Sequence, residues 1–213
     1  RTATAGVDGS GGDMGRVAPT PLPGGPVVFL MAARLIRDKG VHDFVEAARR
    51  VHAEAPQARF VLIGAPDANP NAVTETELEA WRREGVVEIR GQVADPRQAF
   101  ADCHVFVLPS YYREGVPRTN LEALATGRAV ITCDTPGCRE TVRDGVNGLL
   151  VPPRDPAALA EAMLALARDP ARVRAMGQAG RLLCAKRFEL GTVTRATLSA
   201  MDRAEISQGG ADA

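Results

Sequence analysis

Two glutamates eight positions apart, Glu114 and Glu122, have the clearest chemical potential in this 213-residue chain. An apolar run at 105–108 comes before them and predicts a strand, and a short helix that ends near Gly127 is expected to follow. Such a turn would place the first carboxylate over one part of a ligand and the second over another part. Because the helix start between them offers unpaired backbone N–H groups, which attract phosphate, the pattern suits a hydroxyl-rich anion.

Two cations, Arg34 and Lys39, follow directly after the first apolar run at 27–32. A guanidinium offers a fork of donors and an ammonium offers a point charge, so the two together could neutralise a diphosphate. Each charge-assisted hydrogen bond of this kind contributes about 1.5–3 kcal/mol. The alternative is that both side chains are solvated and that Gly40 only opens the next helix.

Other candidate residues also have structural alternatives. Thr119 and Glu122 fit a capping box, which would make Glu122 a helix-start residue worth about 1 kcal/mol. Its functional alternative is a carboxylate that accepts hydrogen bonds from two ribose hydroxyls. Glu114 could be an ordinary exposed acid in a turn. Gly115 and Gly64 would let the backbone approach a sugar closely, but each could equally be a turn glycine.

The elements that must position these residues alternate along the chain. Strand-like apolar runs stand at 27–32, 60–63, 86–89, 105–108, 129–132 and 148–151. Helical patterns stand at 41–53, 74–83, 96–101, 118–126, 138–142, 156–167, 170–184 and 190–204. The alternation predicts an α/β fold, a Rossmann-like parallel sheet with helices on both faces. Ligands bind such sheets beyond the carboxyl ends of the strands. The segments expected at this edge are 34–40, 64–66, 90–92, 110–114 and 133–137.

The two ends of the chain differ from this alternating part. Residues 1–26 are rich in Gly, Thr and Pro and predict a flexible linker, residues 27–204 predict one domain, and residues 205–213 predict a disordered tail. The run at 9–15 is rich in glycine like a dinucleotide-binding loop, but no strand precedes it and its spacing fails. Residue 1 is Arg, so we expect the chain to be part of a longer protein.

Composition argues against several classes of function. Lys plus Arg number 26, as do Asp plus Glu, so no net field attracts nucleic acid or an acidic membrane. No apolar run reaches membrane length and no signal-peptide pattern opens the chain, so we expect no direct membrane insertion. The four cysteines show neither disulfide nor metal spacing and are expected to be reduced thiols, with Cys103 and Cys133 buried at strands. The three histidines are scattered, so no metal site is expected.

Together these motifs resemble the C-terminal half of glycosyltransferases with the two-domain GT-B fold. The likeness is to the large retaining family GT4, the glycosyl transferases group 1, and it covers about residues 27–203. The matching features are Arg34 with Lys39 and Gly40, Glu114 with Glu122, Gly127-x-Ala-Val-Ile131, and Gly145-x-Asn147-Gly148-Leu149-Leu150-Val151-Pro152.

The resemblance implies a domain that binds a nucleotide-sugar donor and needs no metal or cofactor. Arg34 and Lys39 would stabilise the leaving diphosphate. Glu114 would contact the transferred sugar and Glu122 would hold the ribose, while the segment 90–93 would contact the base. Further donor contacts would come from Gly64, Arg90, Val93, Gly115, Val116, Pro117, Arg118 and Thr119. The family more often has Phe-Gly at the position of Val116-Pro117, so the resemblance is weaker for the backbone contacts expected there.

The segments 113–118 and 134–141 resemble bacterial surface-polysaccharide transferases in particular. That likeness implies a UDP-hexose or UDP-N-acetylhexosamine donor, a glycan or lipid-linked acceptor, and retention of the anomeric configuration. It also implies a cytoplasmic protein that is peripheral to the inner membrane through an N-terminal acceptor domain, which this chain lacks. We therefore expect the fragment alone to bind donor but to transfer no sugar.

Two alternatives remain beside this interpretation. A non-catalytic nucleotide-sugar-binding module would have the same motifs. Another GT-B enzyme, such as a nucleotide-sugar epimerase, would share the fold, although the spacing of Glu114 and Glu122 fits donor hydroxyls better than proton removal.

Overall fold

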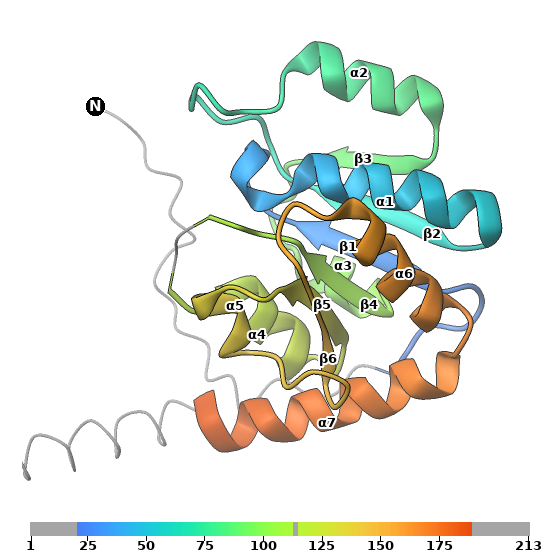
Figure 1. Cartoon of the computed structure of the whole chain (residues 1–213), viewed down its shortest axis with the longest axis vertical. Helices are drawn as coiled ribbons and strands as arrows, with labels where there is room; N and C mark the ends of the chain where they lie inside the picture. Colours follow the sequence, from blue (N-terminus) through green and yellow to red (C-terminus); the bar gives the residue numbers. More distant parts are fainter. Residues whose placement is uncertain (1–20, 113–114, 189–213) are drawn as a thin grey trace, which may run out of the picture.

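The computed structural model of the protein describes residues 21–112 and 115–188. Within them, six parallel strands form one sheet in the order β3-β2-β1-β4-β5-β6 (Figure 1). The strands are β1 Val28–Ala32, β2 Arg59–Ile63, β3 Val87–Gly91, β4 Val105–Leu108, β5 Ala129–Cys133 and β6 Gly148–Val151. The helices are α1 Val41–Glu54, α2 Glu75–Glu84, α3 Arg97–Asp102, α4 Arg118–Ala125, α5 Pro136–Arg139, α6 Pro156–Ala167 and α7 Pro170–Phe188, with a short 3₁₀ helix, η2, at Arg37–Lys39. The predicted α/β fold with a parallel sheet is confirmed.

The four central strands are apolar along their length because both of their faces are covered. Apart from the first residues of β1 and β2, every residue of β1, β2, β4 and β5 is buried. The edge strand β3 instead alternates, with Val87 buried and Glu88 exposed. Strands β1 and β2 pair in register up to Ala32, which lies opposite Ile63. This register brings the carboxyl ends of the two strands level, so the loops that follow them leave the sheet together.

Helices cover the sheet from both sides. In Figure 1, α1 and α6 lie side by side in front of the sheet, and they pack against each other. Helix α3 lies behind it, whereas α4 and α7 pack against each other and against β5. Helix α1 presents Phe44, Ala48 and Val51 to the core at helical spacing, which explains its place over the sheet.

Side chains fix the starts of two of these helices. At α2, the Thr74 hydroxyl accepts a hydrogen bond from the Glu77 N–H, and the Glu77 carboxylate accepts one from the Thr74 N–H. At α6, the Asp155 carboxylate accepts hydrogen bonds from the N–H groups of Ala157 and Ala158. Both starts lie within one residue of the predicted ones.

The helix expected at 138–142 is in a different place. Helix α5 begins at Pro136 and ends at Arg139. Proline suits the first position of a helix because the N–H that it lacks would have no intrahelical partner there. The expected boundary was wrong because it overlooked this start signal.

Residues 21–26 precede β1 and lie against the domain. The Arg128 guanidinium donates to the Pro21 carbonyl at 3.3 Å, the His104 Nε2 lies 3.0 Å from the Pro23 carbonyl oxygen, and Leu22 packs against the core. The end of the segment expected to be a flexible linker is therefore anchored. The remainder of that segment, the helix expected at 190–204 and the tail at 205–213 lie outside the described residues.

Candidate functional site

The loops that leave β1 and β4 are joined where the strand order changes direction. The N–H groups of Tyr111 and Tyr112 both donate to the carbonyl of Asp38, at 3.0 Å each. Gly40 has a φ of 76°, and a Cβ there would lie 2.2 Å from the carbonyl oxygen of Pro109. Open α/β sheets bind ligands at such a switch point. These contacts therefore set the β1 loop against the β4 loop at the predicted binding edge.

Arg34 and Lys39 converge on one aromatic ring at this edge. The Lys39 Nζ lies 5.0 Å from the centroid of the Tyr112 ring, and the central carbon of the Arg34 guanidinium lies 5.9 Å from it. Cations at such distances are attracted to the ring face. Lys39 is largely buried, whereas Arg34 is exposed and donates to the Asp67 carboxylate at 3.2 Å. The structure thus brings the two predicted cations together, and their contact with a diphosphate stays a prediction.

Helix α4 begins directly after this loop. Its first residue is Arg118, and the N-cap residue Pro117 makes no side-chain cap hydrogen bond. Thr119 is therefore already the second residue of the helix, so the capping box with Glu122 that the sequence allowed does not form. The N–H groups of the first turn are left for water or a ligand.

Glu122 lies within α4 and is partly buried. Within residues 21–112 and 115–188, its carboxylate has neither a hydrogen-bond partner nor an ion-pair partner. Burial raises the pKa of this carboxyl, and the charge of Arg118 opposes the rise. A partly buried carboxylate that accepts no hydrogen bond destabilises the fold, so the binding of Glu122 to a ligand stays a prediction.

A cavity of about 780 Å³ opens beside Tyr112, between the ends of β4, β5 and β6. It is lined by Tyr111, Tyr112, Gly115, Thr135, Pro136, Gly137, Cys138, Pro153 and Arg154. The central carbon of the Arg154 guanidinium lies 4.5 Å from the centroid of the Tyr111 ring. Sequence reasoning missed Tyr112 and Arg154, because neither residue belongs to a spaced motif. Gly115 is the predicted site residue, among those described, that lines this cavity.

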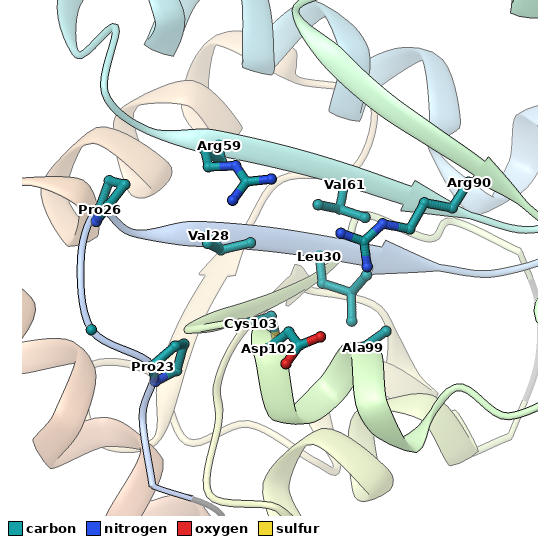
Figure 2. A pocket seen from close by; sticks show the side chains of 11 residues that line it. Pro23, Pro26, Val28, Leu30, Arg59, Val61, Arg90, Ala99, Asp102 and Cys103 are labelled. Atoms are coloured by element: carbon teal, nitrogen blue, oxygen red, sulfur yellow. The ribbon is translucent and has the colours of Figure 1, made fainter.

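The residues predicted at the ends of β2 and β3 are placed differently. A Cβ at Gly64 would lie 2.0 Å from the carbonyl oxygen of Ala33, so packing accounts for this glycine. Val93 packs, partly buried, against the core. Arg90 donates to Glu88 at 2.7 Å and lines a separate pocket of about 260 Å³. Figure 2 shows its guanidinium over apolar side chains of β1 and β2, with α3 below. The structure therefore does not place Arg90 in the cavity beside Tyr112.

The loop at 111–117 exposes apolar side chains. Tyr112 and Val116 are each 38% exposed, while Pro117 is buried. Glu114, the predicted sugar contact, lies outside the described residues.

Metal ligands and reactive thiols do not gather in the described part of the chain. In residues 21–112 and 115–188, no group of three or more His, Cys, Asp or Glu could hold a metal ion. None of the helices described there has both the length and the apolar character needed to cross a bilayer. All four cysteines are buried, and burial raises the pKa of the Cys103 and Cys133 thiols to about 12. Neither of these two is therefore a nucleophile at neutral pH.

A protein-family model described as glycosyl transferases group 1 matches residues 26–169. The chain belongs to this family. The match includes all six strands of the sheet and the loops that carry Arg34, Lys39 and Tyr112. The resemblance inferred from the sequence motifs is confirmed.

Two curated relatives show how much of their length the chain matches. The N,N'-diacetylbacillosaminyl-diphospho-undecaprenol alpha-1,3-N-acetylgalactosaminyltransferase of Campylobacter jejuni is 35% identical over 142 residues, which are 67% of this chain and 36% of that protein. The alpha-maltose-1-phosphate synthase of Mycolicibacterium smegmatis is 37% identical over 186 residues, which are 81% of this chain and 46% of that protein. The chain therefore spans less than half the length of either relative.

A solved structure supports the architecture. Anabaena Alr3699/HepE, crystallised in complex with UDP, matches with a TM-score of 0.73 and 24% identity, over 84% of this chain and 49% of that one. At this identity the likeness concerns the fold alone. The group 1 chain thus has the Rossmann-like sheet predicted from its sequence.

Proposed function

We propose that this group 1 chain is the donor-binding domain of a retaining glycosyltransferase that works without a metal. It would move a hexose or N-acetylhexosamine from a UDP-sugar to a glycan or lipid-linked acceptor in surface polysaccharide synthesis. The observation that carries the proposal is the convergence of Arg34 and Lys39 on Tyr112 at the switch point of the sheet. The nucleotide sugar is a substrate, and no resident cofactor is needed.

The two cations suit the diphosphate of such a donor. Negative charge on UDP grows as its bond to the sugar breaks, so a guanidinium and an ammonium beside it stabilise the transition state more than the ground state. Arg34 also forms an ion pair with the Asp67 carboxylate, but this pair is exposed to solvent. An exposed ion pair contributes about 0–1 kcal/mol, so a diphosphate would compete with it easily.

Glu122 and the uncapped start of α4 suit the ribose and a phosphate. A carboxylate accepts hydrogen bonds from two neighbouring hydroxyls, and Glu122 has none to accept within the described residues. The first-turn N–H groups of α4 would donate to phosphate oxygens. Arg118 and Thr119, the first two residues of α4, supply two of these donors.

The relatives support the same class of reaction. One is named for the transfer of N-acetylgalactosamine and the other for the synthesis of maltose 1-phosphate, and the structure of the same fold was determined with UDP. Because the two relatives are named for different sugars, the sugar of this chain is a matter for experiment. We place the acceptor site, and any contact with a membrane surface, in the remainder of the full-length protein.

Titration of the 213-residue chain with UDP, by calorimetry or NMR, tests donor binding. We expect a Kd between about 10 µM and 1 mM, or roughly 4–7 kcal/mol. Arg34→Ala should lower the affinity for UDP more than the affinity for uridine, because only UDP has the diphosphate. Arg50→Ala is the matched control, since this arginine pairs with Glu46 on α1. No binding of UDP at millimolar concentration would contradict the proposal.

Sugar transfer is tested in the full-length protein. Loss of both UDP binding and turnover in its Arg34→Ala variant would identify an enzyme. UDP binding without any turnover of the unmodified protein would instead indicate a nucleotide-sugar-binding module.

A further inference from the structure

We propose that Arg154 determines donor specificity by donating hydrogen bonds to the sugar of the donor inside the cavity between the ends of β4, β5 and β6. This inference rests on the proposed function, because it takes the diphosphate to lie beside Arg34 and Lys39. It adds where the sugar lies and which side chain selects it.

The cavity adjoins the predicted diphosphate position through Tyr112. The ring of this tyrosine lies next to both cations and also lines the cavity. A sugar attached to a diphosphate beside this ring would therefore lie next to the cavity. Its volume of about 780 Å³ falls within the range of roughly 300–1,000 Å³ that small-molecule sites occupy.

The lining of the cavity suits a pyranose ring. Tyr111, Pro136 and Pro153 give it apolar walls, while Thr135 and Arg154 supply polar side-chain groups. Sites for small molecules combine apolar walls with a few polar groups that fix orientation. A pyranose ring presents C–H groups to such walls and hydroxyls to such donors.

The backbone of Arg154 is strained. Its φ of 59° makes it the single non-glycine residue with a positive φ in the described part of the chain. A long L side chain is disfavoured there, whereas glycine is relaxed. A strained backbone of this kind persists only where the surrounding structure holds the residue in place, and such residues are common at binding sites. Here the guanidinium stacks on Tyr111 at the cavity wall, which fixes its position before any ligand arrives.

The charges around Arg154 favour a neutral sugar over a second phosphate. Asp155 is the next residue, and its carboxylate caps α6. Asp43 on α1 interacts with Arg154, and one of its carboxylate oxygens is buried without a hydrogen bond. Burial raises the pKa of Asp43, and the charges of His42 and Arg154 oppose the rise. Because these two acids partly balance the guanidinium, its remaining donors suit hydroxyls.

The decisive experiment compares UDP with UDP-sugars in the unmodified chain and in Arg154→Gly, by calorimetry. Glycine removes the side chain and relieves the strained φ, so the variant should melt at the same temperature or higher. Affinity for UDP should stay unchanged, whereas affinity for the preferred UDP-sugar should fall about 10- to 150-fold, as expected for one hydrogen bond from a charged donor. UDP-glucose, UDP-galactose and their N-acetylated forms serve as probes.

Arg154→Asn is the second variant, because asparagine also tolerates a positive φ and keeps a polar side chain. It should lose affinity for the UDP-sugar without affecting UDP. Equal weakening of UDP and UDP-sugar, or unchanged binding of every UDP-sugar in both variants, would overturn the role of Arg154 while donor binding stands. No binding of UDP to the unmodified chain would overturn the proposed function itself.

Discussion

The Nζ of Lys39 lies 5.0 Å from the centroid of the Tyr112 ring, so a cation from the β1 loop is held by an aromatic side chain from the β4 loop. Lys39 is only 9% exposed, although it ends a short 3₁₀ helix at the edge of the sheet. A lysine held in this way loses less side-chain entropy when it binds an anion than a solvated lysine does. The contact therefore holds Lys39 at the edge of the sheet, where we propose that the diphosphate binds.

We predict that Lys39→Met weakens the binding of UDP by about 1.5–3 kcal/mol, which is the contribution of one hydrogen bond from a charged group. Methionine keeps most of the volume of the side chain, so the loss reflects the charge. Calorimetry with UDP and with uridine measures it, and Lys186→Met, at an exposed position of α7, is the control. Equal weakening of UDP and uridine would remove the role in diphosphate binding.

We predict that Glu122→Gln binds UDP more weakly by about 1–3 kcal/mol and melts at a higher temperature at neutral pH. Burial raises the pKa of Glu122 above its ordinary value of 4.5 in the folded protein. The folded protein therefore binds this proton more tightly than the unfolded chain does. The free energy of unfolding is highest below that value and falls as the pH rises through the raised pKa, because the buried carboxyl then becomes charged. Glutamine stays neutral and avoids this loss.

Thermal unfolding of both proteins across this pH range checks the stability effect. The gap in melting temperature should open as the pH rises above about 4.5. A lower melting temperature of Glu122→Gln at neutral pH, with UDP affinity intact, would show that the carboxylate serves the fold and not a ligand.

Glu77 is predicted to contribute stability that acid removes. The His42 ring and Arg37 each lie 2.9 Å from its carboxylate, and Thr74 completes the capping box. The hydrogen bond with His42 is the largest of the interactions that lower the pKa of Glu77 from 4.5 to about 2. Its contribution is therefore present above 4.5 and is lost as the pH falls towards 2.

Glu77→Gln should destabilise the protein by about 1 kcal/mol at neutral pH, a modest value because the group is partly exposed. Urea unfolding at neutral pH and near pH 2 measures it, and the two proteins should converge in acid. Glu79→Gln, at an exposed position of the same helix, is the control. A difference in the free energy of unfolding that stays the same at both pH values would show that the charge of Glu77 does not contribute to stability.

Gly40→Ala is predicted to be far more damaging than Gly85→Ala. Both glycines have a positive φ, 76° and 74°, but a Cβ at Gly40 would lie 2.2 Å from the Pro109 carbonyl oxygen, whereas nothing lies within 4 Å of one at Gly85. Gly85→Ala should cost about 1 kcal/mol for its backbone alone. Gly40→Ala should cost several times more, because backbone must move.

The displacement caused by Gly40→Ala would also separate the β1 loop from the β4 loop. Urea unfolding and UDP titration of both variants check this, and Gly40→Ala should lose UDP affinity while Gly85→Ala keeps it. Similar losses of stability in the two variants would show that the contact with Pro109 is easily relieved.

Part of the candidate site could be predicted because it depends on local order in the chain. Arg34 and Lys39 follow a strand that is apolar throughout, and the parallel sheet brings such positions to one edge. The same rule predicts Arg90 at this edge, yet Arg90 lies within β3, an edge strand of the sheet. Its guanidinium donates a hydrogen bond to Glu88 and lines a different pocket. The capping box at Thr119 does not form for a local reason, since the N-cap residue of α4 is Pro117, two residues before Thr119.

The sequence by itself determined the class of fold, the family and the position of Arg34 and Lys39 at one edge of the sheet, because these depend on the period of apolar residues and on motifs that adjoin strands. Only the tertiary structure decided that the side chains of Arg34 and Lys39 both lie against the Tyr112 ring and that Glu122 does not cap α4. It also decided that Arg154 lines the same cavity as Tyr111, although more than forty positions separate them in the chain. Such contacts join segments far apart in the chain. They arise from the packing of one loop on another, for which no local pattern of residues carries a signal.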